Sequence, residues 1–147
     1  MILLHRKWLL ILLILLSFTT LIKAQTTKAD ETGKIYFLRS SGWGGTFSNF
    51  KFYIDDKFVC KAKYKRYSIH EVPTGKHNLK LQYGNKDLKT FKNGMPYIEV
   101  QVESAKSLYY ELVYETGLFT TLIYYKEIDE NTAKEKMKQM KENTSCL

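Results

Sequence analysis

Residue types that hold metals or move protons gather where His70 and Glu71 precede His77 by a few positions. Zinc needs three or four protein ligands that converge on one point. A hairpin with a three-residue loop at 73–75 places Glu71 directly opposite His77 and turns His70 to the other face. We therefore predict a hydrogen bond between Glu71 and His77 at the rim of the core, and no metal. A register shifted by one residue would instead put both histidines on one face.

Two turn residues support this hairpin. Proline suits the second position of such a turn and glycine its left-handed position, and the sequence has Pro73 and Gly75 there. The same register pairs Tyr67 and Ile69 with leucines of the next strand, so that apolar side chains share one face. We assign the turn, and the Glu71–His77 pair that it creates, a structural role.

Other catalytic arrangements are missing from the sequence. Asp55 and Asp56 are neighbours in a tight turn, where aspartate bonds the local backbone, whereas a catalytic pair converges across a cleft. The glycines of Gly42–Gly45 lack the spacing of a phosphate-binding loop. We predict that the protein is not an enzyme and uses no cofactor. Trp43 within that glycine-rich segment is a candidate platform for sugars or apolar groups, or else a cover for one end of the fold.

Positive charge is distributed unevenly along a chain whose formal net charge is +8. Residues 34–92 contain 13 basic and 4 acidic side chains, whereas residues 93–128 contain 2 basic and 5 acidic ones. One half of the molecule is therefore strongly basic, which permits an anionic partner.

The basic residues that we expect to contact such a partner follow from a second hairpin. A three-residue loop at 55–57 puts Lys51 opposite Lys61 on an outer face, with Lys63 next along the strand and Tyr53 nearby. Like charges directly opposite each other destabilise a sheet. We interpret this face as a surface that meets phosphate or carboxylate groups. The alternative is an ordinary solvated lysine-rich face.

The sequence contains two cysteines, Cys60 and Cys146. Cys60 alternates with Phe58 and Ala62 on an apolar strand face, so we interpret it first as a buried free thiol. A disulfide to Cys146 is the alternative, because an exported protein meets an oxidising compartment.

These side chains are positioned by a chain that alternates with period two, which indicates an all-β fold. We predict a small antiparallel β-sandwich of seven or eight strands, at 34–39, 50–54, 58–64, 67–72, 76–83, 97–103, 108–115 and 118–126. Thr132 followed by Glu135 is a capping-box pattern. We expect Ala133–Glu142 to form a short helix with an apolar stripe of Ala133, Met137 and Met140, or else a frayed tail.

Several motifs in this chain resemble the bacterial domain-of-unknown-function family numbered 2846. They are Lys34–Arg39, Phe52–Lys57 and Val72–His77, and the Tyr-Ile-Asp…Pro-x-Gly-x-His core is also similar to PEGA surface modules. The resemblance covers residues 33–128. It implies an exported, small β-sandwich with no established catalytic role. This sequence has Asp56 where the family's hairpin usually carries glycine, and aspartate tolerates the left-handed conformation.

The start of the chain has the layout of a secretory signal peptide. His5-Arg6-Lys7 supplies positive charge, Trp8–Leu16 is continuously apolar, and Ala24 offers a small residue for cleavage. Trp8–Ile22 is shorter than the about 20 residues of a spanning helix. We predict a leader at 1–24, with an uncleaved anchor as the alternative. A polar lead-in (25–33), the sandwich (34–128) and a C-terminal helix or tail (129–147) follow.

Export decides which partners we expect. The protein is predicted to be periplasmic or secreted, as a binding or assembly module of the bacterial envelope that contacts an envelope protein, an anionic glycan or a lipid. Nucleic acid matches the charge, but an exported domain rarely meets it. Membrane contact is expected through an uncleaved leader or peripherally. The alternative function is a structural accessory subunit that docks to an envelope complex through its C-terminal helix.

Overall fold

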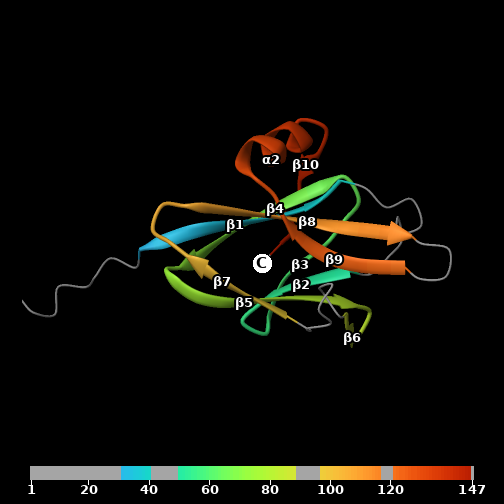
Figure 1. The fold of residues 1–147 in the computed structure, drawn as a ribbon, viewed down its shortest axis with the longest axis horizontal. Helices are drawn as coiled ribbons and strands as arrows, with labels where there is room; N and C mark the ends of the chain where they lie inside the picture. Colours follow the sequence, from blue (N-terminus) through green and yellow to red (C-terminus); the bar gives the residue numbers. More distant parts are fainter. Residues whose placement is uncertain (1–30, 41–49, 89–96, 117–120, 147) are drawn as a thin grey trace, which may run out of the picture. The chain divides into compact units, whose positions relative to one another are not determined.

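Alternating side chains build the strands of this protein: Phe50, Phe52 and Ile54 are buried, whereas Lys51 and Tyr53 between them face outward. The computed structural model describes residues 31–40, 50–88, 97–116 and 121–146. Within these residues the strands form two five-stranded sheets, A and B, which pack against each other as a sandwich (Figure 1).

Sheet A has the first strand of the described residues at its centre. In spatial order it consists of β10 (Lys141–Glu142), β4 (Arg66–Pro73), β1 (Thr32–Arg39), β8 (Ser107–Thr116) and β9 (Thr121–Glu127). The pairs β4–β1 and β8–β9 are antiparallel, whereas β1–β8 and β10–β4 are parallel.

Sheet B is built around β5. In spatial order it contains β3 (Lys57–Lys61), β2 (Phe50–Ile54), β5 (Gly75–Tyr83) and β6 (Lys86–Asp87), and β7 (Tyr97–Val102) also pairs with β5. All pairs in this sheet are antiparallel. The prediction of a β-sandwich with a short C-terminal helix is confirmed. The short strands β6 and β10 and the parallel β1–β8 pair are additions to it.

Aromatic side chains join the two sheets. The rings of Phe37 in β1 and Phe52 in β2 stack with centroids 4.4 Å apart. Tyr125 of β9 lies 5.3 Å from Phe52 and is almost fully buried. Burying a side chain of this size stabilises a fold by about 1.5–3 kcal/mol, so these three rings tie the sheets together strongly.

The turn at residues 73–75 does not form the predicted hairpin. It carries the chain from β4 in sheet A to β5 in sheet B, with Gly75 at φ 136°. Pairing with β1 turns His70 into the core and leaves Ile69 exposed, the reverse of the predicted orientation. The error has a physical reason: proline and glycine suit a connection between sheets as well as a hairpin, and the partner strand decides which face is buried.

The hairpin between β2 and β3 forms, but with a shorter loop than predicted. Asp55 and Asp56 have φ of 49° and 62°, which is the two-residue turn that matches strand twist. A bulge then shifts the register, so that Tyr53 lies opposite Phe58 and Lys51 lies opposite Lys61. The predicted three-residue loop is wrong near the turn. Beyond the bulge, the predicted Lys51–Lys61 pairing is confirmed.

The C-terminal helix, α2 (Glu130–Met137), lies on the outer side of sheet A (Figure 1). It begins three residues earlier than predicted, because Asp129 rather than Thr132 is the N-cap: the Thr132 amide donates to Asp129 Oδ1 at 2.9 Å. The predicted end at Glu142 is wrong, because α2 ends at Met137 and residues 141–142 form β10. Ala133 is fully buried and Met137 packs in the same cluster as predicted, and Met140 joins it from the turn after the helix.

Cys60 and Cys146 form a disulfide, so the interpretation of Cys60 as a free thiol is wrong. β10 lies on the β4 edge of sheet A, and the segment after it runs to β3 at the edge of sheet B. The side chain of Asn143 is buried on this path and donates to the Lys61 carbonyl at 3.1 Å. Residues 143–146, the C-terminal strap, therefore join the two sheets along one open side.

Candidate functional site

The outer surface of sheet B combines cations with exposed rings. We name it the lysine–aromatic face and define it by Lys51, Lys61, Tyr53, Phe58, Lys80 and Tyr97. One row across the strands is Phe58–Tyr53–Lys80–Tyr97, because these residues are successive cross-strand partners. Side chains directly opposite each other share a face at about 4.5–5.5 Å between Cβ atoms. Four strands thus supply one continuous surface.

The aromatic side chains of this face are accessible. Phe58 is 36% exposed and Tyr97 is 41% exposed. Tyr53 is half-buried, and its ring meets that of Phe58 edge to face at 5.8 Å. Flat, partly exposed rings on a rigid sheet offer apolar surface to a ligand without having to reorganise.

The lysines of the face differ in their partners. Lys80 pairs with Asp56, and this hydrogen bond raises the pKa of Lys80 above its ordinary value. Lys51 instead donates to Asn85 Oδ1 at 3.3 Å, and among the described residues neither Lys51 nor Lys61 has a carboxylate partner. The two charges that lie opposite each other are therefore uncompensated.

Three of the predicted binding residues, Lys51, Tyr53 and Lys61, come together on this face. Lys63 lies beyond the end of β3 and donates to Ser145 Oγ of the C-terminal strap at 2.9 Å. Trp43 lies outside the described residues.

Phe58 and Tyr97 were not predicted as members of the face. The bulge turns the Phe58 side chain to the outer face. Tyr97 lies on the face because β7 pairs with β5, a pairing that no local sequence pattern predicts.

The predicted bond between Glu71 and His77 is wrong. Glu71 is exposed and pairs with Lys34 at 3.6 Å, whereas His77 belongs to the other sheet. His77 Nδ1 lies 2.6 Å from Asp55 Oδ2, and Nε2 lies 2.8 Å from the Pro73 carbonyl. Both ring nitrogens therefore have protein partners, and His77 has a structural role through a different contact from the predicted one.

Asp55 anchors the β2–β3 turn to β5. Burial by itself raises the pKa of Asp55, but hydrogen bonds from the Asn78 amide, at 2.9 Å, and from His77 outweigh it and lower the pKa. A carboxylate held in this way is a structural acceptor.

His70 is buried, and its Nε2 lies 2.9 Å from Ser68 Oγ. Burial lowers the pKa of His70 to about 4. A cavity of about 340 Å³ at the open side of the sandwich is lined by His70 and His77 together with apolar residues such as Ile54, Val59 and Val72. Since both rings already bond to protein groups, this cavity presents no free imidazole nitrogen pair to a metal.

No family model, curated protein or solved structure matches this chain.

In the part of the chain that the structure describes, no group of three or more His, Cys, Asp or Glu side chains is placed to hold a metal ion. Within the same residues, no helix has the length and apolar character needed to cross a membrane.

The disulfide bears on the compartment in which the protein works. Disulfides form and persist in oxidising environments, so the Cys60–Cys146 bond indicates an extracytoplasmic location. The predicted leader at 1–24 lies outside the described residues.

Proposed function

We propose that this protein is an exported, non-catalytic binding module of the bacterial cell envelope that holds anionic polymers on its lysine–aromatic face. The observation that carries the proposal is the pair of opposed lysines, Lys51 and Lys61, which no described carboxylate compensates. Outside sheet B, Lys34, Lys106 and Lys134 each pair with a glutamate. The opposed lysines of the face thus lack the counter-charge that these other lysines have.

Binding a polyanion would relieve the repulsion between Lys51 and Lys61. Two ammonium groups that lie opposite each other repel in the free protein, and a polyanion laid across both strands removes that repulsion while it gains two ion pairs. Rings of Tyr53, Phe58 and Tyr97 supply apolar contact surface beside the charges. This combination suits an acidic glycan, whose residues carry both charged groups and apolar ring faces.

The acid–base groups of the chain support the non-catalytic part of the proposal. His77 and Asp55 are bonded to each other and to the backbone, and His70 is buried against Ser68. Both ring nitrogens of His77 and both oxygens of Asp55 are thus taken up by protein groups, and burial against Ser68 holds the His70 ring away from the lysine–aromatic face. The motif resemblance to family 2846 and to PEGA modules, and a periplasmic or secreted location, belong to the same proposal.

The accessory-subunit alternative receives less support. Its contact surface would be the apolar side of α2 and of the turn after it, but Ala133, Met137 and Met140 pack against Leu38 and Tyr109 of sheet A. The remaining helix surface is mostly charged, so it offers little apolar area to a partner.

Neutralising the open lysines tests the proposal. The triple variant Lys51→Gln, Lys61→Gln, Lys63→Gln should keep or slightly raise the free energy of unfolding, because a like-charge contact is removed. Its affinity for polygalacturonate at low salt should fall about tenfold, as expected for three exposed charge contacts. Isothermal titration calorimetry measures the affinity, and chemical denaturation measures the stability.

A matched control separates the face from net charge. The variant Lys34→Gln, Lys106→Gln, Lys134→Gln removes the same formal charge from lysines outside sheet B that have glutamate partners. It should bind polygalacturonate like the wild type. Equal losses in both triple variants would reduce the effect to net charge, and unchanged affinity in the first would make the face an ordinary solvated surface.

A further inference from the structure

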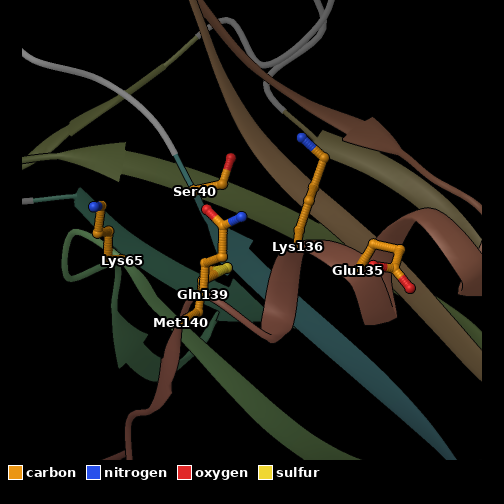
Figure 2. Close-up of a pocket in the computed structure, with 6 residues that line it drawn as sticks. All are labelled: Ser40, Lys65, Glu135, Lys136, Gln139 and Met140. Carbon is orange, nitrogen blue, oxygen red and sulfur yellow. The ribbon is translucent and has the colours of Figure 1, made fainter.

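A polar cavity of about 390 Å³ lies beneath α2, at the edge of sheet A (Figure 2). Its lining comes from the end of β1, from the turn before β4 and from α2 with the turn that follows it. The lining residues are Ser40, Lys65, Glu135, Lys136, Gln139 and Met140. The volume falls within the about 300–1,000 Å³ that is typical of small-molecule sites.

Part of this lining is held in place by a buried carboxylate. Glu111 of β8 is 7% exposed, and its Oε1 accepts hydrogen bonds from Ser40 Oγ and from Lys136 Nζ, the latter at 2.9 Å. Glu135, at the far side, pairs with Lys138 at 2.6 Å. A lysine whose charge is matched by a buried glutamate is positioned firmly, and its ammonium group still has N–H groups to donate.

Two other groups of the lining have no hydrogen-bond partner among the described residues. The Lys65 ammonium meets the Tyr64 ring at 5.7 Å, but among the described residues it has no carboxylate partner. The side-chain amide of Gln139 likewise makes no hydrogen bond to a described residue. Figure 2 shows Ser40 and Gln139 between the two lysines that line the cavity. The cavity thus offers one uncompensated cation, one free amide and further hydrogen-bond donors.

This set of groups selects a ligand by its chemistry. Two ammonium groups disfavour a metal cation, and the shortage of apolar wall disfavours an acyl chain or an aromatic ligand. A negatively charged group of the ligand can pair with the Lys65 ammonium. Hydroxyl groups of the ligand can form hydrogen bonds with the Gln139 amide and accept from the remaining N–H groups of Lys136. We propose that the cavity beneath α2 binds one acidic sugar residue, with its anionic group on Lys65 and its hydroxyls on Gln139 and Lys136.

One short connection links the lysine–aromatic face to the cavity. Lys61 ends β3 in sheet B, Lys63 follows it, and Lys65 lies in the turn before β4 in sheet A, with φ of 51°. Because four residues span at most about 13 Å even when fully extended, Lys61 and Lys65 lie within reach of a few units of one polymer. A linear acidic glycan held on the face can place one residue in the cavity, and in this respect the inference rests on the proposed function.

Monosaccharides test the cavity separately from the face. Natively purified protein with its disulfide intact is titrated with galacturonate and with glucose 6-phosphate, which distinguish a carboxylate from a phosphate as the anionic group. Neutral galactose is the control ligand. We expect one of the two acidic sugars to shift the amide resonances of Lys65, Lys136 and Gln139, with a dissociation constant on the order of 1 mM. Galactose should leave these resonances in place.

Two single variants test which side chains of the cavity bind the acidic sugar. Lys65→Gln should weaken the acidic sugar at least fivefold, as should Gln139→Ala, and both side chains are exposed enough to leave the melting temperature unchanged. Lys34→Gln is the matched control and should have no effect. Absence of shifts with both acidic sugars, or equal shifts with inorganic phosphate alone, would overturn the sugar site.

The outcomes for face and cavity can be told apart. Lys51→Gln, Lys61→Gln, Lys63→Gln should weaken polygalacturonate but leave the monosaccharide titration unchanged. If this variant keeps full polymer affinity while monosaccharides still shift Lys65 and Gln139, the face fails and the cavity stands. If the polymer depends on the face but no acidic sugar reaches the cavity, the proposed function stands and this inference fails.

Discussion

Replacing both Cys60 and Cys146 by alanine lowers the free energy of unfolding by about 4 kcal/mol, the largest effect on stability that we expect. The bond closes a loop with a sequence separation of 86 residues, and a cross-link over that length removes much of the entropy of the unfolded chain. For a domain of this size, the melting temperature should fall by about 15 °C. Thermal and chemical denaturation of the purified variant measure both quantities.

Reduction of the wild-type protein provides the matched experiment without a change of sequence. Dithiothreitol should lower the melting temperature by an amount similar to that of the double variant and should have no further effect on that variant. Asn143→Ala, which removes the buried strap contact to Lys61 but keeps the bond, should cost less, about 1–2 kcal/mol. A reduced wild type as stable as the oxidised protein would contradict the role of the strap.

Acidification from pH 7 to pH 4 should destabilise the fold by about 2–3 kcal/mol through His70 alone. Its pKa is about 4 in the fold and 6.5 in the unfolded chain. Between these values the unfolded chain binds a proton that the folded protein does not, so stability falls as the pH drops from 6.5 toward 4. Above pH 6.5 both states are neutral and this contribution is fully present. The expected loss is below the full value of the shift because His70 lines a cavity that solvent can approach.

His70→Gln isolates this contribution, because glutamine can bond Ser68 and does not titrate. In urea denaturation at several pH values, the free energy of unfolding should fall more steeply for the wild type than for the variant between pH 7 and pH 4. Asp55 and Asp129 also have lowered pKa values, but their contribution is lost only as the pH falls below the ordinary carboxyl range. Parallel curves would show that His70 is not the acid-sensitive group.

Local patterns predicted the elements that depend on neighbours in the chain. Alternation over residues 50–54 predicted β2 with its observed bounds, and the two aspartates predicted the turn after it. The Lys51–Lys61 pair followed, since a hairpin brings together strands that are adjacent in sequence. Here local propensity and the final fold agree, which is why the opposed lysines of the candidate face are predictable from the sequence.

The sequence patterns predicted the wrong strand pairing where a strand could pair with either of two partners. The turn at Pro73 and Gly75 is chemically compatible with a hairpin, yet β4 pairs with β1 and β5 pairs with β2. Register depends on which partner the strand meets, and one exchange of partner turned His70 inward and separated Glu71 from His77. The cavity beneath α2 has the same origin, because Ser40 and Gln139 are about a hundred positions apart in the chain.

The lysine–aromatic face separates what the sequence predicts from what only the tertiary structure determines. The sequence predicted that Lys51, Tyr53 and Lys61 share an outer face, because turning the apolar side chains of both strands inward leaves these three outward. In the structure, the bulge after the two-residue turn brings Lys61 opposite Lys51. The tertiary structure alone decided that Phe58 and Tyr97 join them, that Lys65 faces a cavity, and that Cys60 reaches Cys146. Those contacts join residues far apart in sequence or depend on a bulge, and they form because packing two sheets buries more apolar surface than any local arrangement can.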